Sequence, residues 1–272
     1  MRFRQLQILS NTLHEYQARC GLSGMVRAIR SKFNDTHPLA PLKKDRGFNV
    51  RLRTKDLEVY AQVFDNYQYS YRPAKPVNCI VDAGANIGCS AVFFARSFPG
   101  ANIICIEAAK ENYELLTRNC TAFPNITCLH AALWTMEGQV DVVDVGLGEW
   151  AFRVRQLTPI PGEVPSNGKR VQAVTLREIM RTYSLNSIDI LKVDIEGGER
   201  EVFAEGPELL EKVNVLAVEC HDKWVPGCSR SVMEATRNFA FEWMQGETMF
   251  FCREGWLPVG FHESRYRKIR PH

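Results

Sequence analysis

The sequence has no long apolar stretch. No segment reaches the roughly 18 consecutive apolar residues that identify a membrane-spanning helix. The N-terminal segment, MRFRQLQILSNTLHEYQ, also lacks an apolar core of signal-peptide length, because polar residues interrupt it throughout. We therefore expect no membrane partner and no export.

The sequence also lacks a large excess of either charge and closely spaced cysteine pairs. The formal net charge is only +3 at pH 7, too little to predict binding to nucleic acid. The nine cysteines are odd in number and contain no C-x-x-C pair, which predicts free, mostly buried thiols in a reducing cytoplasm. Repeats and low-complexity segments are absent. The 272 residues, 45% of them hydrophobic, suffice for one α/β domain with additions and a small-molecule partner.

One stretch, CIVDAGANIG (79–88), has the pattern of a nucleotide-binding unit. The apolar run at its start predicts a buried strand, the glycines a tight loop, and the following residues a helix. The central glycine of a G-x-G-x-x-G dinucleotide fingerprint is missing, and Asn86 stands in its place. Asp82 ends the strand, where a carboxylate would repel a pyrophosphate.

A second acid, Glu107, ends the next predicted strand. A carboxylate at that point can accept hydrogen bonds from both hydroxyls of a ribose. Two acid-ended strands favour S-adenosylmethionine over NAD as the cofactor. The predicted cofactor-binding residues are Asp82, Gly84, Asn86, Gly88, Glu107 and, from a later strand, Asp194.

The remaining pattern predicts a domain over 78–272 with a helical and strand extension over 1–77. Helical spacing before residue 34 is broken at Gly21 or Gly24, and the extension could support oligomers. Residues 137–173 predict a β-hairpin insertion with a mobile loop over 159–169. Residues 231–244 predict a helix, followed by a closing hairpin from 249–252 and 256–261.

Three segments resemble the FkbM-type methyltransferase family: VDAGANIG (81–88), IDILKVDIEGGE (188–199) and LAVECH (216–221). The resemblance implies the class I S-adenosylmethionine-dependent fold. That fold is a Rossmann-like α/β architecture, with a mostly parallel seven-stranded sheet, helices on both faces and an antiparallel last strand. It also implies O-methylation of a hydroxyl on a sugar, polyketide or other small molecule. It implies cofactor contacts at Asp82, Gly84, Asn86 and Glu107.

Several polar residues follow the later predicted strands, at the edge where ligands of open α/β sheets bind. We expect His221 to act as the base, because the ordinary pKa of imidazole lies near neutrality. Asp194 or Glu196 could instead orient the acceptor or accept the proton. Lys192 is either a further catalytic group or a partnered structural charge.

Two further residues are candidates for the acceptor side. Glu219 ends its strand beside these groups. Trp150 lies in the irregular insertion, where it either stacks on the substrate or adenine or anchors the hairpin. The tyrosines at 67, 69 and 71 either pack over the sheet edge or line the mouth of the site.

The acidic residues also allow a divalent cation such as magnesium, held among Asp194, Glu196, Glu219, His221 and Asp222. We favour direct contact of the carboxylates with the acceptor. Three functions compete: an S-adenosylmethionine-dependent O-methyltransferase, an NAD-linked oxidoreductase, and a non-catalytic adaptor that keeps the fold.

Overall fold

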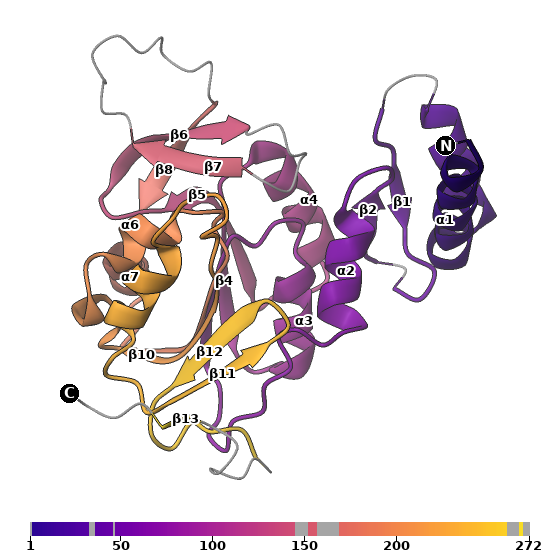
Figure 1. Ribbon diagram of the computed structural model, residues 1–272. Coiled ribbons are helices and arrows are strands. Elements are labelled where there is room, and N and C mark those ends of the chain that lie inside the picture. Colours follow the sequence, from indigo (N-terminus) through magenta and orange to yellow (C-terminus); the bar gives the residue numbers. More distant parts are fainter. Residues whose placement is uncertain are drawn as a thin grey trace, which may run out of the picture.

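The computed structural model describes residues 2–32, 36–45, 47–144, 152–156, 169–259 and 267–268. Its centre is a twisted sheet flanked by helices (Figure 1). The central parallel strands occur in the order β10 (Val213–Glu219), β9 (Ile188–Val193), β3 (Cys79–Ala83), β4 (Asn102–Glu107), β5 (Ile126–Leu133) and β8 (Lys169–Val174). The Rossmann-like α/β class predicted from the sequence is confirmed.

The sheet is wider than the expected seven strands, since eleven strands are hydrogen-bonded in the described residues. At one edge, β6 (Gly138–Asp144) and β7 (Phe152–Gln156) add an antiparallel pair beside β8. At the other edge lie β12 (Thr248–Cys252), β11 (Phe241–Gln245) and the short β13 (Arg267–Lys268), all antiparallel to their neighbours. The hairpin predicted in the insertion accounts for the first pair.

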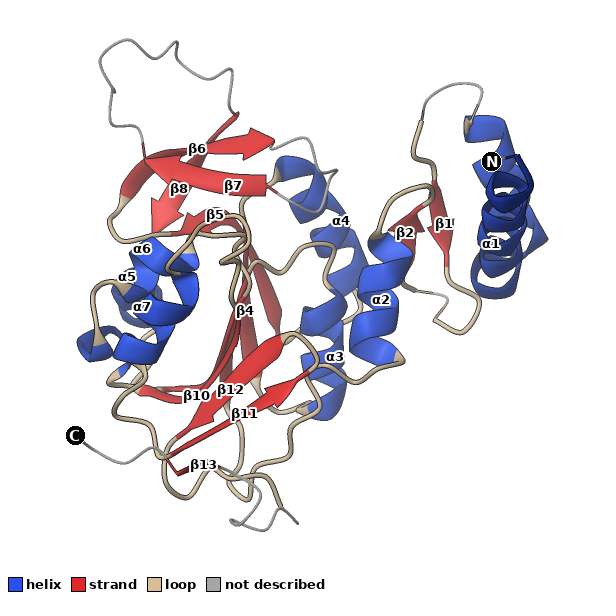
Figure 2. Ribbon diagram, viewed as in Figure 1, coloured by secondary structure: helices blue, strands red, loops and turns tan. Residues whose placement is uncertain are grey.

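Helices cover both faces of the sheet (Figure 2). On one face lie α2 (Asp56–Phe64), α3 (Cys89–Ser97) and α4 (Lys110–Cys120). On the other lie α5 (Leu176–Thr182), α6 (Glu199–Phe203), α7 (Cys228–Ala235) and the 3₁₀ turn η1 (Pro207–Leu210). Successive residues of β3 point to opposite faces, so Ile80 packs with the first group and Val81 with the second.

The N-terminal segment shares its hydrophobic core with the sheet. It contains α1 (Arg2–Ser31), interrupted at Gly21 (φ 81°), and the antiparallel pair β1 (Leu39–Pro41) and β2 (Asn49–Arg51). Phe48 is buried against Tyr60 of α2, and Phe64 of the same helix contacts Phe93 of α3. The break predicted at Gly21 is thus confirmed, and α2 connects this segment to the sheet domain (Figure 1).

The predicted helix over 231–244 is wrong in its second half. Helix α7 ends at Ala235, and the chain re-enters the sheet as β11. Trp243 of β11 stacks on Phe250 of β12, with 5.0 Å between ring centroids. Pairing with β12 buries these side chains, which an isolated helical turn would leave exposed.

The loop predicted at 159–169 lies, except for its last residue, outside the described residues. Among the described helices, none has both the length and the apolar character that crossing a bilayer requires.

Candidate active site

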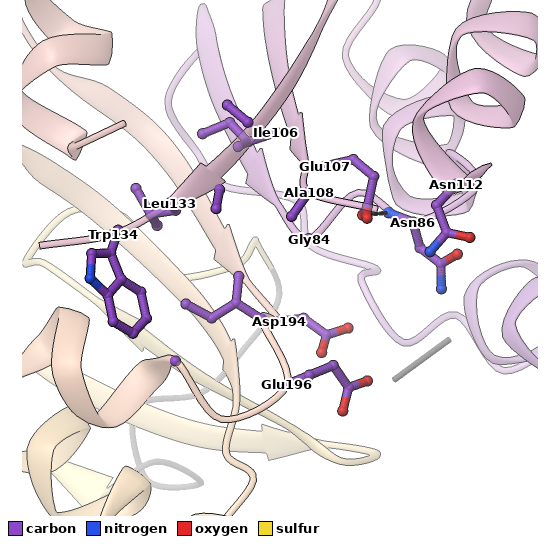
Figure 3. Close-up of a pocket in the computed structure, with 14 residues that line it drawn as sticks. Gly84, Asn86, Ile106, Glu107, Ala108, Asn112, Leu133, Trp134, Asp194 and Glu196 are labelled. Carbon is purple, nitrogen blue, oxygen red and sulfur yellow. Dashed lines mark hydrogen bonds between the residues drawn. The ribbon is translucent and has the colours of Figure 1, made fainter. Parts of the chain in front are cut away.

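A small cavity of about 50 Å³ opens at the carboxyl ends of β3, β4, β5 and β9. Glu107, Asn86 and Asn112 lie on one side, and Trp134 lies on the other (Figure 3). We call it the narrow cavity.

The loop after β3 passes against the chain after β9. Gly84 has φ 76°, and a Cβ there would lie only 1.7 Å from the backbone oxygen of Asp194. Gly88, with φ 95°, faces Leu116 of α4, whose Cδ1 would lie 3.0 Å from an added Cβ. Asn86 between them also has a left-handed φ of 49°. Glycine at 84 is therefore a requirement of the crossing, and it brings the loop to the wall of the narrow cavity.

Glu107 lies at the end of β4 with its carboxylate fixed by backbone groups. One oxygen accepts a hydrogen bond from the amide of Asn86 and the other from the amide of Ala109, each at 2.8 Å. Burial raises the pKa of this carboxyl, although both hydrogen bonds act in the opposite direction. A carboxylate oxygen has more than one lone pair, so Glu107 can still accept hydrogen bonds from a ligand.

Trp134 was not predicted from the sequence. It follows directly after β5, is 5% exposed and lines the narrow cavity. Among the described residues, its indole Nε1 finds no hydrogen-bond acceptor. Its place one residue past a strand was the signal that could have identified it. The residue predicted instead, Trp150, lies outside the described residues.

Asp82 does not line the narrow cavity, and its side chain is completely buried. It accepts a hydrogen bond from Ser90 Oγ at 2.6 Å, and Lys192 Nζ lies 3.2 Å away. Lys192 also donates to the carbonyl oxygen of Gly84 at 2.6 Å. Burial is the largest single effect and would lower the pKa of Lys192, but Asp82, Tyr69 and Asp194 together raise that pKa. In this structure Asp82 positions the glycine loop through Lys192.

Four predicted residues gather at one end of the narrow cavity: Asp194 and Glu196, which line it, and Glu219 and His221 next to them. His221 Nε2 lies 3.7 Å from Asp194 Oδ1, 3.4 Å from Glu196 Oε2 and 3.7 Å from Glu219 Oε1. The strands β9 and β10 are paired in parallel and bring these groups to one edge. The sequence prediction that they lie together is consistent with this geometry, while their chemical roles stay predictions.

Glu199 is the second residue that the sequence did not reveal as part of the site. It is fully buried and accepts hydrogen bonds from the amides of Ile195 (3.0 Å) and Gly197 (2.8 Å). Its Oε1 also lies 3.0 Å from His221 Nδ1. Because a carboxylate only accepts, Nδ1 carries the hydrogen and Nε2 faces the other three acids. The same contacts hold Glu196 in a left-handed conformation, φ 56°.

The crowding of charge shifts several pKa values. Burial would lower the pKa of His221, but the hydrogen bond and charge of Glu199, with Asp194 and Glu196, raise it to about 10. Burial, followed by repulsion from Asp194, raises the pKa of Glu196 to about 8 and that of Glu219 to about 7. Asp222, the remaining predicted ligand, accepts hydrogen bonds from the amides of Gly227 and Ser229 at the start of α7.

A second cavity, of about 440 Å³, lies on the other side of these groups. We call it the wide cavity. It shares Gly84, Asn86, Asp194 and Glu196 with the narrow cavity. Glu219 and His221 line it, and so do Lys55, Glu58, Val59, Gln62 and Val63 of the N-terminal segment.

The three predicted tyrosines have different positions. Tyr69 lines the wide cavity. Tyr71 is buried and donates a hydrogen bond to the carbonyl of Trp256, whereas Tyr67 is largely exposed. Both alternatives considered for this group therefore occur, each for a different residue.

Comparison with known proteins gives consistent results. The model of the methyltransferase FkbM domain matches residues 82–244. The methyltransferase sdnD of Sordaria araneosa is 29% identical over 212 residues, covering 65% of this chain and 78% of the relative. The 2-O-methyltransferase NoeI of Sinorhizobium fredii (strain NBRC 101917 / NGR234) is 26% identical over 184 residues, 64% of this chain and 73% of that protein.

Among solved structures, that of methyltransferase FkbM from Methylobacillus flagellatus KT is similar, with a TM-score of 0.45 and 15% identity. The similarity covers 65% of this chain and 44% of that one, which is less than half its length.

Proposed function

The chain belongs to the methyltransferase FkbM domain family and is a methyltransferase, and from this premise we propose that it moves the methyl group of S-adenosylmethionine to a hydroxyl oxygen. The proposed acceptor is a small molecule such as a sugar or a polyketide-type product. One observation carries the proposal: the narrow and wide cavities meet at Gly84, Asn86, Asp194 and Glu196. A cofactor in the first can thus face an acceptor in the second.

The residues of the narrow cavity fit this cofactor. Glu107 presents a fixed carboxylate for the ribose hydroxyls. Trp134 offers an aromatic face, and its indole N–H has no hydrogen-bond acceptor among the described residues. Both features suit the adenine end of the cofactor. Gly84 and Asn86 bring backbone atoms to the wall of the narrow cavity. Asp194 supplies a carboxylate for the ammonium group of the methionine part. Gly88, just before α3, packs this loop against Leu116 of α4.

Bound S-adenosylmethionine supplies a methyl group on a positively charged sulfur. As the acceptor oxygen forms its bond to this carbon, the carbon–sulfur bond breaks and its electron pair stays on sulfur. The acceptor's proton must leave as well, and a positioned base contributes about 10²–10⁴-fold. The proposed residues around this step are His221, Asp194 and Glu196, with Glu219 and Lys192 beside them. Because the raised pKa of His221 keeps the imidazole protonated near neutral pH, a carboxylate replaces it as the proposed base. Their alignment of the acceptor contributes as much as proton removal does.

Two other functions remain as outcomes of the test. An NAD-linked oxidoreductase is disfavoured by the missing central glycine of the loop, and a non-catalytic adaptor by the intact polar cluster. A small-molecule acceptor, with neither nucleic acid nor membrane as partner, stays part of the proposal. So does a cytoplasmic location, which nine free thiols support.

Calorimetry tests the cofactor directly. We expect S-adenosylhomocysteine to bind and NADH not to bind, and the reverse result would replace the proposal with the oxidoreductase. A screen of sugar and polyketide alcohols by mass spectrometry then tests the reaction, with a gain of one methylene per product. Methylation confined to carboxyl or amine acceptors would contradict O-methylation of hydroxyls.

A further inference from the structure

Three side chains at the junction of the two cavities direct metal-ligating atoms to one point. One ligand atom each of Asp194, Glu219 and His221 lies within 4.8 Å of the other two. The residues follow or end β9 and β10, whose pairing fixes their spacing. We infer that they bind one divalent transition-metal ion, of the Mn²⁺ or Zn²⁺ kind, which holds the acceptor hydroxyl. This inference rests on the proposed function.

The orientation of His221 is the first independent support. The ring is buried to nine-tenths, and its Nδ1 is committed to Glu199, which is itself fully buried. Nε2 therefore faces Asp194, Glu219 and Glu196, the last with its Oε2 3.4 Å away. A carboxylate that fixes the far nitrogen of a histidine is the usual second sphere of a histidine metal ligand.

The distances are the second support. Ligand atoms lie about 2.0–2.2 Å from such an ion, so two neighbouring ligands are about 3.0–3.5 Å apart. Nε2 is 3.7 Å from both Asp194 Oδ1 and Glu219 Oε1. A movement of a few tenths of an ångström would bring Nε2 and each of these oxygens to that spacing, and the three ligand atoms already lie within 4.8 Å of one another.

The ligand set indicates the kind of ion. Magnesium and calcium prefer oxygen ligands only, whereas an imidazole with two carboxylates suits manganese, iron or zinc. The sequence allowed magnesium without favouring a metal, and the ligand set points instead to a transition metal. Three protein ligands leave positions open, as in catalytic rather than structural metal sites.

The open positions face the wide cavity, which Glu219 and His221 line. A hydroxyl oxygen bound there would lose its proton more readily, because the ion stabilises the alkoxide. In this arrangement His221 is a ligand, and Glu196, 3.4 Å from Nε2, is the carboxylate that takes the proton. The alkoxide oxygen then forms the new bond to the methyl carbon.

The test uses the full-length chain after treatment with a chelator. Titration with MnCl₂, followed by electron paramagnetic resonance, should give one bound ion per chain, and calorimetry with ZnCl₂ should agree. Asp194→Asn, Glu219→Gln and His221→Ala should each weaken binding at least tenfold. Glu199→Gln should weaken it about 10–100-fold, the usual effect of losing an outer-sphere partner. The control is Glu247→Gln, an acid of the wide cavity outside the three-ligand set, which should bind the ion like the wild type.

A spectroscopic signature avoids dependence on variants that fail to fold. Pulsed electron paramagnetic resonance of the Mn²⁺-loaded wild type should show coupling to a nitrogen nucleus, as expected for His221 Nε2. Absence of bound ion at millimolar concentration, or an ion without nitrogen coupling, overturns the site. Equal loss of affinity in Glu219→Gln and Glu247→Gln also overturns it, since the ion would then be held by diffuse charge.

Measurement of cofactor binding distinguishes failure of the metal inference from failure of the proposed function. Glu219 lines the wide cavity and is not among the residues of the narrow one, so Glu219→Gln should lose the metal and keep its affinity for S-adenosylhomocysteine. If the wild type methylates its acceptor at full rate after chelation, the metal inference fails and the proposed function stands. If S-adenosylhomocysteine does not bind at all, the proposed function fails whatever the metal titration gives.

Discussion

At the scale of single residues, the ion pair of Asp82 and Lys192 has a structural position under the cofactor loop. Both side chains are almost fully buried, and the lysine connects the carboxylate to the carbonyl of Gly84. A buried pair contributes little net stability, but removal of one partner leaves an uncompensated charge. The loop therefore depends on the two charges being kept together.

We predict that Asp82→Asn lowers the free energy of unfolding by about 3–5 kcal/mol. Urea denaturation measures this change. It should also weaken S-adenosylhomocysteine binding by about 1–3 kcal/mol, since Lys192 no longer holds Gly84 in place. The double variant with Lys192→Met serves as the control and should lose less stability than the sum of the single variants. Independent, additive losses would show that the two residues do not act as a pair.

The second residue-scale prediction concerns Glu107. Burial raises its pKa above 4.5 in the folded protein, so the carboxyl takes up its proton at a higher pH folded than unfolded. Proton uptake thus favours folding as the pH falls, but it removes a charged acceptor for the ribose hydroxyls. Affinity for S-adenosylhomocysteine should fall as the pH drops through this raised pKa. Calorimetry from neutral to acid pH measures the trend.

Glu107→Gln is the matched control for that experiment. It should bind weakly at every pH and lack the acid-dependent loss. If the wild type and Glu107→Gln lose affinity in parallel on acidification, another group is responsible.

At the scale of elements, the glycine loop after β3 and the segment after β9 cross at atomic contact. An added Cβ at Gly84 would meet the backbone of Asp194, which no side-chain rotation can relieve. The conformation at φ 76° adds a further cost for any other residue.

We predict that Gly84→Ala lowers the free energy of unfolding by several kcal/mol and abolishes cofactor binding. Thermal unfolding and calorimetry measure the two effects. Gly100→Ala is the control, because no atom lies within 4 Å of the place its added methyl group would take and its backbone is not left-handed. That variant should unfold near the wild-type temperature. A Gly84→Ala protein with wild-type stability and affinity would mean that the crossing relaxes freely.

The elements differ in how well the sequence predicts them. The strands β3, β4 and β9 are short β-branched runs between clear loops, and local pattern was sufficient to identify them. Strand β11 was missed because its pairing with β12 and the packing of Trp243 are tertiary contacts, which local helical pattern does not contain. Trp134 and Glu199 were missed for the same reason, since their roles depend on partners that only the folded chain brings near.

At the scale of the whole molecule, the folded unit that contains the sheet extends further toward the N-terminus than the family match, which starts at Asp82. Residues from Phe48 to Tyr69 belong to the same hydrophobic core as α3 and α4. The boundary predicted at 77/78 from the sequence remains a prediction, and a fragment tests it.

We predict that the fragment 78–272 does not fold, because it loses the side chains that cover α3. Circular dichroism and S-adenosylhomocysteine titration measure this. Phe48→Ala in the full chain should cost about 3–5 kcal/mol, the usual loss for a buried aromatic side chain. A fragment that unfolds cooperatively and binds the cofactor like the full chain would support the boundary and contradict the shared core.

The position of α2 has a consequence for the history of the protein. The family match starts at Asp82, while Lys55, Glu58, Val59, Gln62 and Val63 line the wide cavity from outside it. Substitutions on this helix alter the acceptor's surroundings without touching the glycine loop or Glu107. Under the proposed function, relatives that differ on this helix would therefore differ in the acceptor they methylate while keeping the same donor site. Exchange of residues 48–69 between two members should transfer acceptor preference, and donor affinity should stay with the recipient.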